Sequence, residues 1–377
     1  MNDCDPRLTA LVVARITGPL GRACREEIRR GLPLTAPHLL AEQVPSCAKY
    51  LDGRALIEAE ITIRRWESEG IIPIAFSSSD YPHTLRNHPE APLLFYGRGD
   101  VLSALSASEK TLAIAIVGSR NASPRGCEMA KQFASELRDY GACIISGLAL
   151  GIDGAAHAGA LQIEGRGSCP TIAVLGNGLH VVYPASHRRL ARRILDEGGV
   201  LVSAYEPGTP PLPHHFLERN GIIAYLSRAV IVVQAAIRSG ALSTVRWALD
   251  AGAEVMAVPG AVGDDRHSGT HAMIKQGAHL VTSVDDIVTI LGLTPRPATT
   301  SRAPIPPAVA EAFKKGDGTV HRDALVGTEG PLTAADLIAF ECQGLLTLLP
   351  GNLVQLAPSV SNCLSRITIR PPKPPPL

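Results

Sequence analysis

Aromatic residues are scarce in this chain of 377 residues, and their scarcity limits the kinds of surface it can form. They make up 4% of the sequence, which argues against binding nucleic acid through long rows of stacked bases. The formal net charge is only +1, so a site for a polyanion must come from cations placed locally. A globally basic, aromatic-rich binding protein is therefore excluded.

Paired cysteines and long apolar runs are also missing. The eight cysteines form no C-x-x-C pair, and the histidines lack supporting ligands, so we expect no zinc site, no other metal and no cofactor. No apolar run approaches the roughly 20 residues of a membrane helix, and the first residues do not resemble a secretory signal. These absences predict a cytoplasmic protein without a membrane partner, its cysteines reduced.

Enough apolar sequence is present for more than one domain. Hydrophobic residues make up 45% of the chain and charged residues 19%, which is typical of globular proteins with sizeable cores. Amphipathic stretches, β-rich runs and proline-rich segments follow one another along the chain. We expect a helical region at 1–66, an α/β domain at 67–293, a proline-rich linker at 294–307, a winged-helix-like module at 308–358 and a disordered tail at 359–377.

The central region alternates short apolar runs with amphipathic helices. Each run is rich in β-branched residues and is bounded by glycine or proline, which is typical of strands that are covered on both faces. This order predicts an α/β fold with a Rossmann-like, doubly wound and mostly parallel sheet. The predicted strands are 112–117, 143–146, 171–176, 200–205, 229–234 and 254–260.

The first of these strands ends in Gly118, Ser119 and Arg120. Ser123 is then a good N-cap and Pro124 a good first residue for the next helix. Free amides at a helix N-terminus attract anions, and an arginine binds phosphate in a fork. The segment fits neither G-x-G-x-x-G nor a P-loop. It predicts a phosphate-binding turn, with a tight turn and a solvated arginine as the alternative.

The second strand ends in a similar glycine turn, with Ser146 and Gly147. Asp153 and His157 follow at a spacing of four residues, so they share one face of a helix. They have the spacing of a catalytic pair. We expect instead that Asp153 caps the helix and that His157 packs or forms hydrogen bonds locally.

Later strand ends add further polar groups. The segment "HFLERNG" contains Phe216, Arg219 and Asn220, and "RSGALST" contains Ser239 and Gly240. Arginines at 188, 189, 192 and 193 share helix faces, either as an anion site or as a solvated surface. Small anion-binding loops without a nucleophile–base pair predict a binding protein rather than an enzyme.

Five of these segments, in this order and spacing, resemble the DNA-processing protein A (DprA/Smf) family. They are "AIVGSR", "SGLALGIDGAAHAGAL", "TIAVLGNGLHVVYP", "ERNGIIAYLS" and "SGALST…A…GAEVMAVPG". The resemblance is strong over residues 70–290 and weaker over the N-terminal region, which is similar to that family's SAM-like domain, and over the C-terminal module. It implies a protein that binds single-stranded DNA, dimerises and loads the recombinase RecA during natural transformation, with no known catalysis.

The resemblance also assigns DNA-binding residues. The first turn corresponds to the family's phosphate-binding loop, and other positions fall on the same pocket. The residues that match are Gly118, Ser119, Arg120, Ser146, Gly147, Arg219, Asn220, Ser239 and Gly240, with Phe216 in a matching stretch. The segment at 269–281 is a candidate dimer interface.

The chain departs from the family pattern at several positions. Gly221 stands where the family usually has a second arginine, and Tyr225 where it has a glycine. Gln234 replaces a common acidic residue, and His187 a common asparagine. The missing arginine removes a phosphate contact, so these changes bear on DNA affinity more than on the fold.

Two other functions compete with DNA binding. Phosphoribohydrolases that resemble lysine decarboxylases share this type of sheet, but they carry a glutamate on the helix after a glycine turn. Trp247 stands near that position in this chain, which leaves no proton carrier there. The second alternative is a winged-helix transcription factor, whose recognition helix would be "LTAADLIAFECQGLL". It contains no lysine or arginine, so it suits packing or a protein partner better than a DNA groove.

Overall fold

The computed structural model describes residues 4–110, 112–162 and 169–294, and in the C-terminal region residues 313, 319–326, 337, 346–349 and 352–356. The chain divides into two compact units, Met1–Arg296 and Pro297–Leu377. In the part of the chain so described, no helix is both long and apolar enough to span a bilayer.

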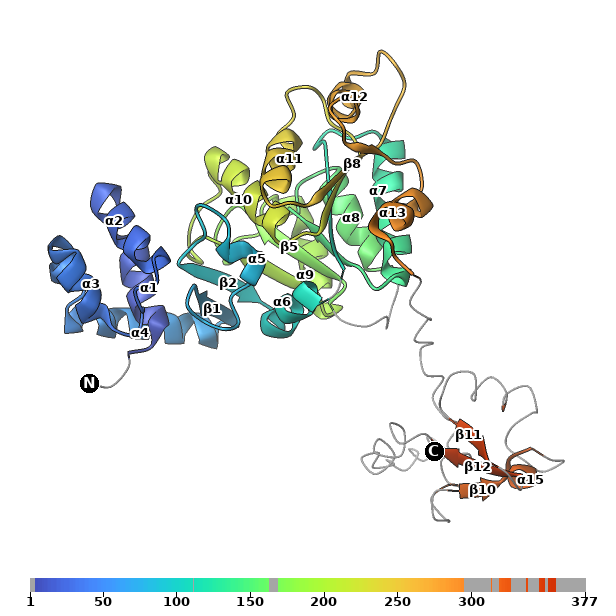
Figure 1. Ribbon diagram of the computed structural model, residues 1–377, viewed down its shortest axis with the longest axis horizontal. Coiled ribbons are helices and arrows are strands. Elements are labelled where there is room, and N and C mark those ends of the chain that lie inside the picture. Colours follow the sequence, from blue (N-terminus) through green and yellow to red (C-terminus); the bar gives the residue numbers. More distant parts are fainter. Residues whose placement is uncertain are drawn as a thin grey trace, which may run out of the picture. The chain divides into compact units, whose positions relative to one another are not determined.

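Short helices form the start of the first unit (Figure 1). Proline lies in the first turn of the first three helices, where a missing backbone N–H costs nothing. Trp66 joins these helices to the sheet, because its ring meets Tyr96 edge-on at 5.4 Å between centroids. The predicted helical region is thus packed against the sheet. Its elements are α1 (Pro6–Arg15), α2 (Gly18–Arg29), α3 (Pro37–Gln43), the 3-10 helix η1 (Pro45–Tyr50) and α4 (Gly53–Ser68).

The centre of the first unit is a nine-stranded sheet in the order β1-β2-β6-β5-β4-β3-β7-β8-β9. Along the sheet order β6-β5-β4-β3-β7-β8-β9, neighbouring strands pair in parallel. At the other edge β1 pairs with β2, and β2 with β6, in antiparallel fashion. Each of the six predicted strands is present, which confirms the doubly wound, mostly parallel fold. The strands are β1 (Ile71–Ala75), β2 (Leu94–Arg98), β3 (Ala113–Val117), β4 (Cys143–Ser146), β5 (Thr171–Leu175), β6 (Val200–Ser203), β7 (Ala229–Val232), β8 (Glu254–Ala257) and β9 (His279–Leu280).

Helices cover both faces of the sheet (Figure 1). Along β3, Ala113, Ala115 and Val117 join the core beneath α6, α10 and α11, while Ile114 and Ile116 join the core beneath α7, α8 and α13. This double burial explains why the strands are continuous apolar runs. The helices are α5 (His83–Arg86), α6 (Val101–Lys110), α7 (Pro124–Asp139), α8 (Ile152–Ala160), η2 (Ala185–His187), α9 (Arg188–Asp196), α10 (Pro213–Tyr225), α11 (Ala241–Asp250), η3 (Asp265–His267), α12 (Ser268–Lys275) and α13 (Val284–Leu291).

The strand order reverses between β3 and β7. From β3 the chain proceeds through β4, β5 and β6 on one side, and β7, β8 and β9 lie on the other. Connections that leave β3 and β7 therefore diverge, and they open a crevice at the carboxyl ends of these strands. The turn at 118–123 lies at this switch point.

The second unit contains a three-stranded antiparallel sheet in the order β10-β12-β11. β11 and β12 pair as a hairpin with Leu349 opposite Leu353, and Asn352 between them has a left-handed φ of 62°. This hairpin lies within the region 308–358 for which we expect a winged-helix-like module. Most of the predicted helices of this module, the tail and nearly all of the linker lie outside the described residues. Its elements are β10 (Thr319–His321), α15 (Arg322–Leu325), β11 (Leu346–Leu349) and β12 (Leu353–Leu356).

Candidate nucleic-acid interface

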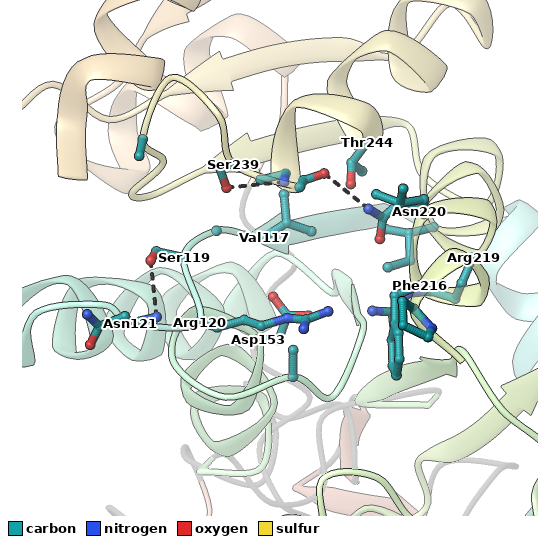
Figure 2. A pocket seen from close by; sticks show the side chains of 18 of the residues that line it. Val117, Ser119, Arg120, Asn121, Asp153, Phe216, Arg219, Asn220, Ser239 and Thr244 are labelled. Atoms are coloured by element: carbon teal, nitrogen blue, oxygen red, sulfur yellow. Dashed lines mark hydrogen bonds between the residues drawn. The ribbon is translucent and has the colours of Figure 1, made fainter. Parts of the chain in front are cut away.

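A groove of about 730 Å³ lies at the switch point (Figure 2). Its walls are the turn after β3, one side of α10, and the loop from β7 into α11. We call it the switch-point groove. Of the ten residues predicted to bind DNA, those that line it are Gly118, Ser119, Arg120, Phe216, Arg219, Asn220, Ser239 and Gly240.

Arg120 provides an accessible positive charge in the groove. Its side chain is exposed, and among the residues that the structure describes no carboxylate lies within ion-pair distance of it. The guanidinium carbon lies 5.1 Å from the centre of the Phe216 ring, and it points across the groove toward α10 (Figure 2). Arg120 is therefore free to bind an anion while the aromatic face holds it in place.

The backbone amides of the turn are already engaged. Ser119 N–H donates to the Gln234 carbonyl at 2.7 Å, and Asn121 N–H donates to Ser119 Oγ at 3.1 Å. Ser123 N–H donates to Gln234 Oε1 at 2.9 Å, and Gly126 N–H to Ser123 Oγ at 3.0 Å. These four amides are satisfied within the fold, so for them the expectation of phosphate binding is wrong. The predicted N-cap Ser123 is confirmed, and anion binding rests on Arg120.

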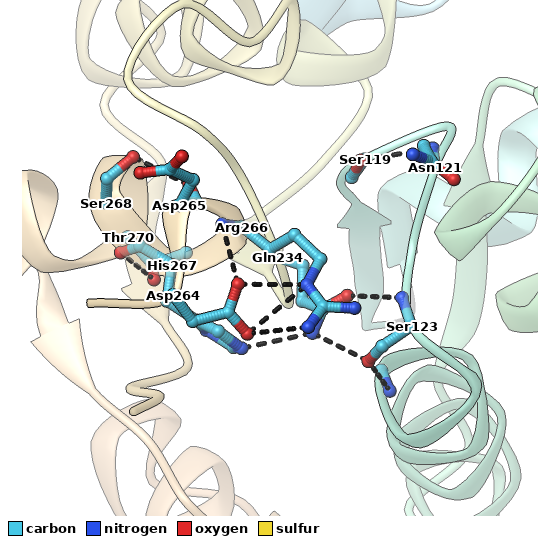
Figure 3. Close-up of polar contacts among 11 residues, drawn as sticks. Ser119, Asn121, Ser123, Gln234, Asp264, Asp265, Arg266, His267, Ser268 and Thr270 are labelled. Carbon is cyan, nitrogen blue, oxygen red and sulfur yellow. Dashed lines mark hydrogen bonds and ion pairs between the residues drawn. The ribbon is translucent and has the colours of Figure 1, made fainter. Parts of the chain in front are cut away.

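Gln234 anchors this turn from the end of β7 (Figure 3). Its buried amide nitrogen donates to Ser123 Oγ at 2.9 Å and lies 3.0 Å from His267 Nε2. A β-carbon at Gly118 or Gly126 would collide with Gln234, so both glycines permit the close approach. A carboxylate in place of this amide has no hydrogen to donate. Gln234, unlike the acid common in the family, can therefore donate hydrogen bonds to both Ser123 and a neutral His267.

Arg219 forms a wall of the groove. Only 3% of it is exposed, and Nη1 donates to the carbonyls of Gly147 (2.5 Å) and Val174. Burial lowers the pKa of its guanidinium to about 10, and Asp153 partly offsets that effect. Two backbone carbonyls thus hold Nη1, whereas the buried Nε has no hydrogen-bond partner among the described residues. Arg219 therefore supports the groove wall, and its predicted phosphate contact stays a prediction.

Ser146 and Gly147 lie beneath the groove. Ser146 is fully buried, and its hydroxyl donates to the Ile116 carbonyl at 2.7 Å. Gly147 N–H donates to Asp153 Oδ2 at 3.0 Å, and a β-carbon at Gly147 would collide with Arg219. These two residues therefore position the groove wall and do not form part of its lining, contrary to the sequence-based assignment.

The Asp153–His157 pair also differs from expectation in part. Gly151, with a φ of 75°, is the N-cap of α8, and Asp153 lies one residue into the helix, where it accepts from the preceding loop. The predicted cap is thus wrong. His157 is fully buried and its Nδ1 lies 2.7 Å from Thr171 Oγ1, which confirms local packing. Burial lowers its pKa to about 3, so it remains neutral.

Asn220 joins the two helices that border the groove. Its Nδ2 donates to the Gly240 carbonyl at 3.2 Å and to Ser243 Oγ at 2.8 Å. Ser239 Oγ in turn accepts from Ala241 N–H at 3.3 Å. The positions predicted in "ERNG" and "RSGALST" are thus brought together, as the resemblance requires.

Two further residues belong to the groove and were not among the predicted binding residues. Tyr183 is 45% exposed, with its ring 5.5 Å from that of Phe216, and exposed Arg238 lies beside Ser239. Both follow the carboxyl end of a strand, which is the signal that located the turn at 118. The arginines of α9 behave differently, because Arg193 pairs with Glu197 at 2.9 Å on the solvated helix face.

The geometry defines the class of protein. The described residues contain no cluster of three potential metal ligands, and α11 has no carboxylate before Asp250, its last residue. A cationic groove lies at the switch point of an open parallel sheet. The chain is thus a Rossmann-like protein with an arginine-lined groove at the switch point of its sheet.

Comparisons with known proteins identify the family. The family model for DNA recombination-mediator protein A matches residues 73–292. Protein Smf of Escherichia coli K12 is 37% identical over 316 residues, which cover 80% of this chain and 82% of that protein. DNA processing protein DprA of Streptococcus pneumoniae is 43% identical over 208 residues, or 55% of this chain and 70% of that protein. The chain belongs to the DNA recombination-mediator protein A family, as the sequence motifs predicted.

Solved structures of members of this family resemble the fold of this chain. The X-ray structure of Streptococcus pneumoniae DprA superposes with a TM-score of 0.59 at 31% identity and covers 77% of this chain and 98% of its own. Helicobacter pylori DNA processing protein A gives a TM-score of 0.51 at 26% identity, covering 59% of this chain and 95% of its own. The Helicobacter pylori protein binds single-stranded DNA, in a mode described as unique.

Proposed function

We propose that this protein binds single-stranded DNA and acts as a recombination mediator in DNA uptake by natural transformation. The observation that carries the proposal is Arg120, an exposed arginine without a carboxylate partner among the described residues, held over an aromatic ring in a groove at the sheet's switch point. A family of DNA recombination mediators and a relative with a described single-stranded DNA binding mode support it.

The chemistry of the groove suits a flexible strand. Arg120 binds a phosphate in a fork, while the rings of Phe216 and Tyr183 offer stacking surfaces to bases. Arg238 adds a second exposed cation, and Asp153 is the one carboxylate of the lining. The groove therefore binds the backbone with little dependence on sequence.

The test is a substitution that removes the free guanidinium. Arg120→Ala should weaken binding to a labelled oligo-dT roughly tenfold or more, because it removes a charge-assisted contact of about 1.5–3 kcal/mol. Fluorescence anisotropy measures the affinity. Arg54→Ala is the matched control, since that side chain of α4 is 87% exposed and pairs only with the nearby Glu58 among the described residues.

Salt dependence checks the same assignment. With about three phosphates neutralised, wild-type affinity should fall roughly twentyfold between 50 and 200 mM salt, and the Arg120→Ala slope should be smaller by about one phosphate. Equal affinities for wild type and Arg120→Ala, with unchanged thermal unfolding, would refute the role of the groove.

The remaining parts of the proposal concern partners and location. We infer that the protein loads RecA onto the bound strand, dimerises through α12 and β9, and does so in the cytoplasm. The six free cysteines of the described residues agree with a reducing compartment. We also infer that it acts by binding rather than by catalysis.

A further inference from the structure

A second pocket lies on the opposite side of α10 from the switch-point groove. It encloses about 400 Å³, and we call it the Trp247 pocket. Leu217 lines both cavities, and the hydrogen bond from Asn220 to Ser243 lies where they adjoin. The residues that give this pocket its character are Glu90, Tyr205, Leu217, Glu218, Ser243 and Trp247.

The floor of the Trp247 pocket is aromatic. The His88 ring lies 4.7 Å from Trp247 and 4.8 Å from Tyr225, measured between centroids. His88 and Tyr225 are buried, whereas Trp247 is half-buried and borders the cavity. Burial lowers the pKa of His88 to about 4, so this floor carries no charge at neutral pH.

The aromatic floor accounts for two departures from the family pattern. A β-carbon at Gly221 would collide with the His88 ring, so the arginine that is common there cannot coexist with this packing. Tyr225, where the family has glycine, fills the other side of the same ring. The chain has exchanged a cation beside the groove for an uncharged aromatic surface.

Carboxylates border this aromatic surface. Glu218 Oε2 accepts from the Tyr205 hydroxyl at 2.6 Å, which leaves Oε1 able to accept from a ligand. Glu90 is exposed on the same pocket. Two carboxylates repel phosphate, so the pocket does not extend the phosphate path. They accept hydrogen bonds from N–H groups.

A neutral ligand suits the pocket better than a cation. The Arg29 guanidinium, bonded to the Ala91 carbonyl at 3.0 Å, is close enough to His88 to lower its pKa electrostatically. Its positive field offsets part of the carboxylate charge. A flat, uncharged ring with neighbouring N–H donors can stack on the aromatic floor and donate hydrogen bonds to the carboxylates at the border.

We propose that the Trp247 pocket receives one nucleobase of the strand bound in the switch-point groove, and that it prefers guanine. Guanine presents two adjacent donors, N1–H and the N2 amino group, which suit the remaining Oε1 of Glu218 and the carboxylate of Glu90. Thymine presents a single N–H between two carbonyls, which carboxylates repel. Stacking on Trp247 contributes affinity for any base, and hydrogen bonds to the carboxylates determine the preference for guanine. This inference rests on the proposed single-stranded DNA binding.

The experiment compares labelled oligo-dT with oligonucleotides of equal length that carry isolated guanines, cytosines or adenines. Wild type should bind the guanine-containing strand about tenfold more tightly than oligo-dT, since one well-matched hydrogen-bonded pair discriminates by about that factor. The double variant Glu90→Gln/Glu218→Gln should lose this preference and keep its affinity for oligo-dT within about threefold. Glu58→Gln, on exposed α4, is the control and should keep the preference.

A variant that removes the stacking surface tests the contribution of Trp247. Trp247→Leu should reduce the affinity for all four strands by severalfold, and its folding is checked by thermal unfolding.

The outcomes separate the two proposals. Tight binding of oligo-dT without a preference for guanine, or a preference that survives the double glutamine variant, overturns the base pocket and leaves the groove intact. A preference for cytosine or adenine over guanine also overturns it. Loss of the Arg120 effect on oligo-dT instead overturns the DNA-binding proposal itself.

Discussion

Two arginines of one groove show how burial decides what a residue does. Arg219 is 3% exposed, and its guanidinium donates to two backbone carbonyls. Arg120 is exposed and lies against an aromatic face. The same side chain is therefore held by the backbone in one place and open to solvent in the other.

Gln234 carries the residue-scale prediction. Gln234→Glu restores the family's acid but loses the donation to Ser123 and places a carboxylate 3.0 Å from His267 Nε2. We expect the free energy of unfolding to fall by about 1–3 kcal/mol at pH 8, as measured by urea denaturation. Gln43→Glu, at an exposed position, should change it little.

The pH dependence distinguishes this explanation from a general loss of packing. In the wild type, burial lowers the pKa of His267, so its contribution to stability decreases as pH falls through the unfolded value near 6.5. In Gln234→Glu the new carboxylate should raise that pKa. The added stability is then present at low pH and lost as pH rises. A variant with the wild-type pH trend would contradict the role of the amide.

At the scale of elements, the most accessible edge of the sheet is β9. It has two residues, pairs on one side with β8, and exposes 51% of Leu280. An exposed strand edge offers unpaired backbone N–H and C=O groups to another chain, and the exposed leucine adds apolar surface beside them. This edge therefore supports the proposed dimer interface around α12 and β9.

Leu280→Glu tests that interface. A charge at the centre of the contact should convert the dimer to a monomer, since an unpaired carboxylate resists burial. Light scattering gives the mass. Leu249→Glu is the control, since that leucine of α11 is 65% exposed. If wild type is monomeric at micromolar concentration, or if Leu280→Glu remains dimeric, this interface is wrong.

At the scale of the whole molecule, the charge is nearly balanced at +1. The lining of the switch-point groove has Arg120, Arg219 and Arg238 against Asp153, so the groove is cationic although the whole chain is nearly neutral. Such a molecule can hold a strand locally while leaving the rest of the strand accessible to another protein. This arrangement suits a mediator.

Strand loading by the full chain is the corresponding prediction. Wild type should accelerate assembly of RecA on single-stranded DNA that is covered by single-strand-binding protein, and Arg120→Ala should not, because it no longer holds the strand. Arg54→Ala should behave like wild type. The rate is followed by RecA-dependent ATP hydrolysis, and acceleration by Arg120→Ala equal to that of wild type would separate loading from the groove.

Local sequence patterns predicted much of the fold and part of the groove. Six apolar runs became parallel strands, and Ser123 and Pro124 begin α7 as expected. These features depend on neighbours in sequence, namely strand burial and helix capping. Position at the end of a strand was also sufficient to place Arg120 and Gly240 near one another.

Other parts of the site depend on residues distant in sequence. The amides of Ser119 and Ser123 are satisfied by Gln234, which lies 111 residues from Ser123. Ser146 is hidden because its strand is central in the sheet. Such partners have no local signature, so the motifs located the groove correctly while misjudging which of its groups are free.

The sequence by itself determined the order of strands and helices, the loops that carry small and charged residues, and the family to which the chain belongs, because all of these follow from local pattern. Only the tertiary structure decided that Arg120 is free while Arg219 is occupied, and that Gly221, His88 and Tyr225 pack together. Availability to a ligand depends on solvent exposure and on long-range hydrogen-bond partners, and both exist only once the chain is folded.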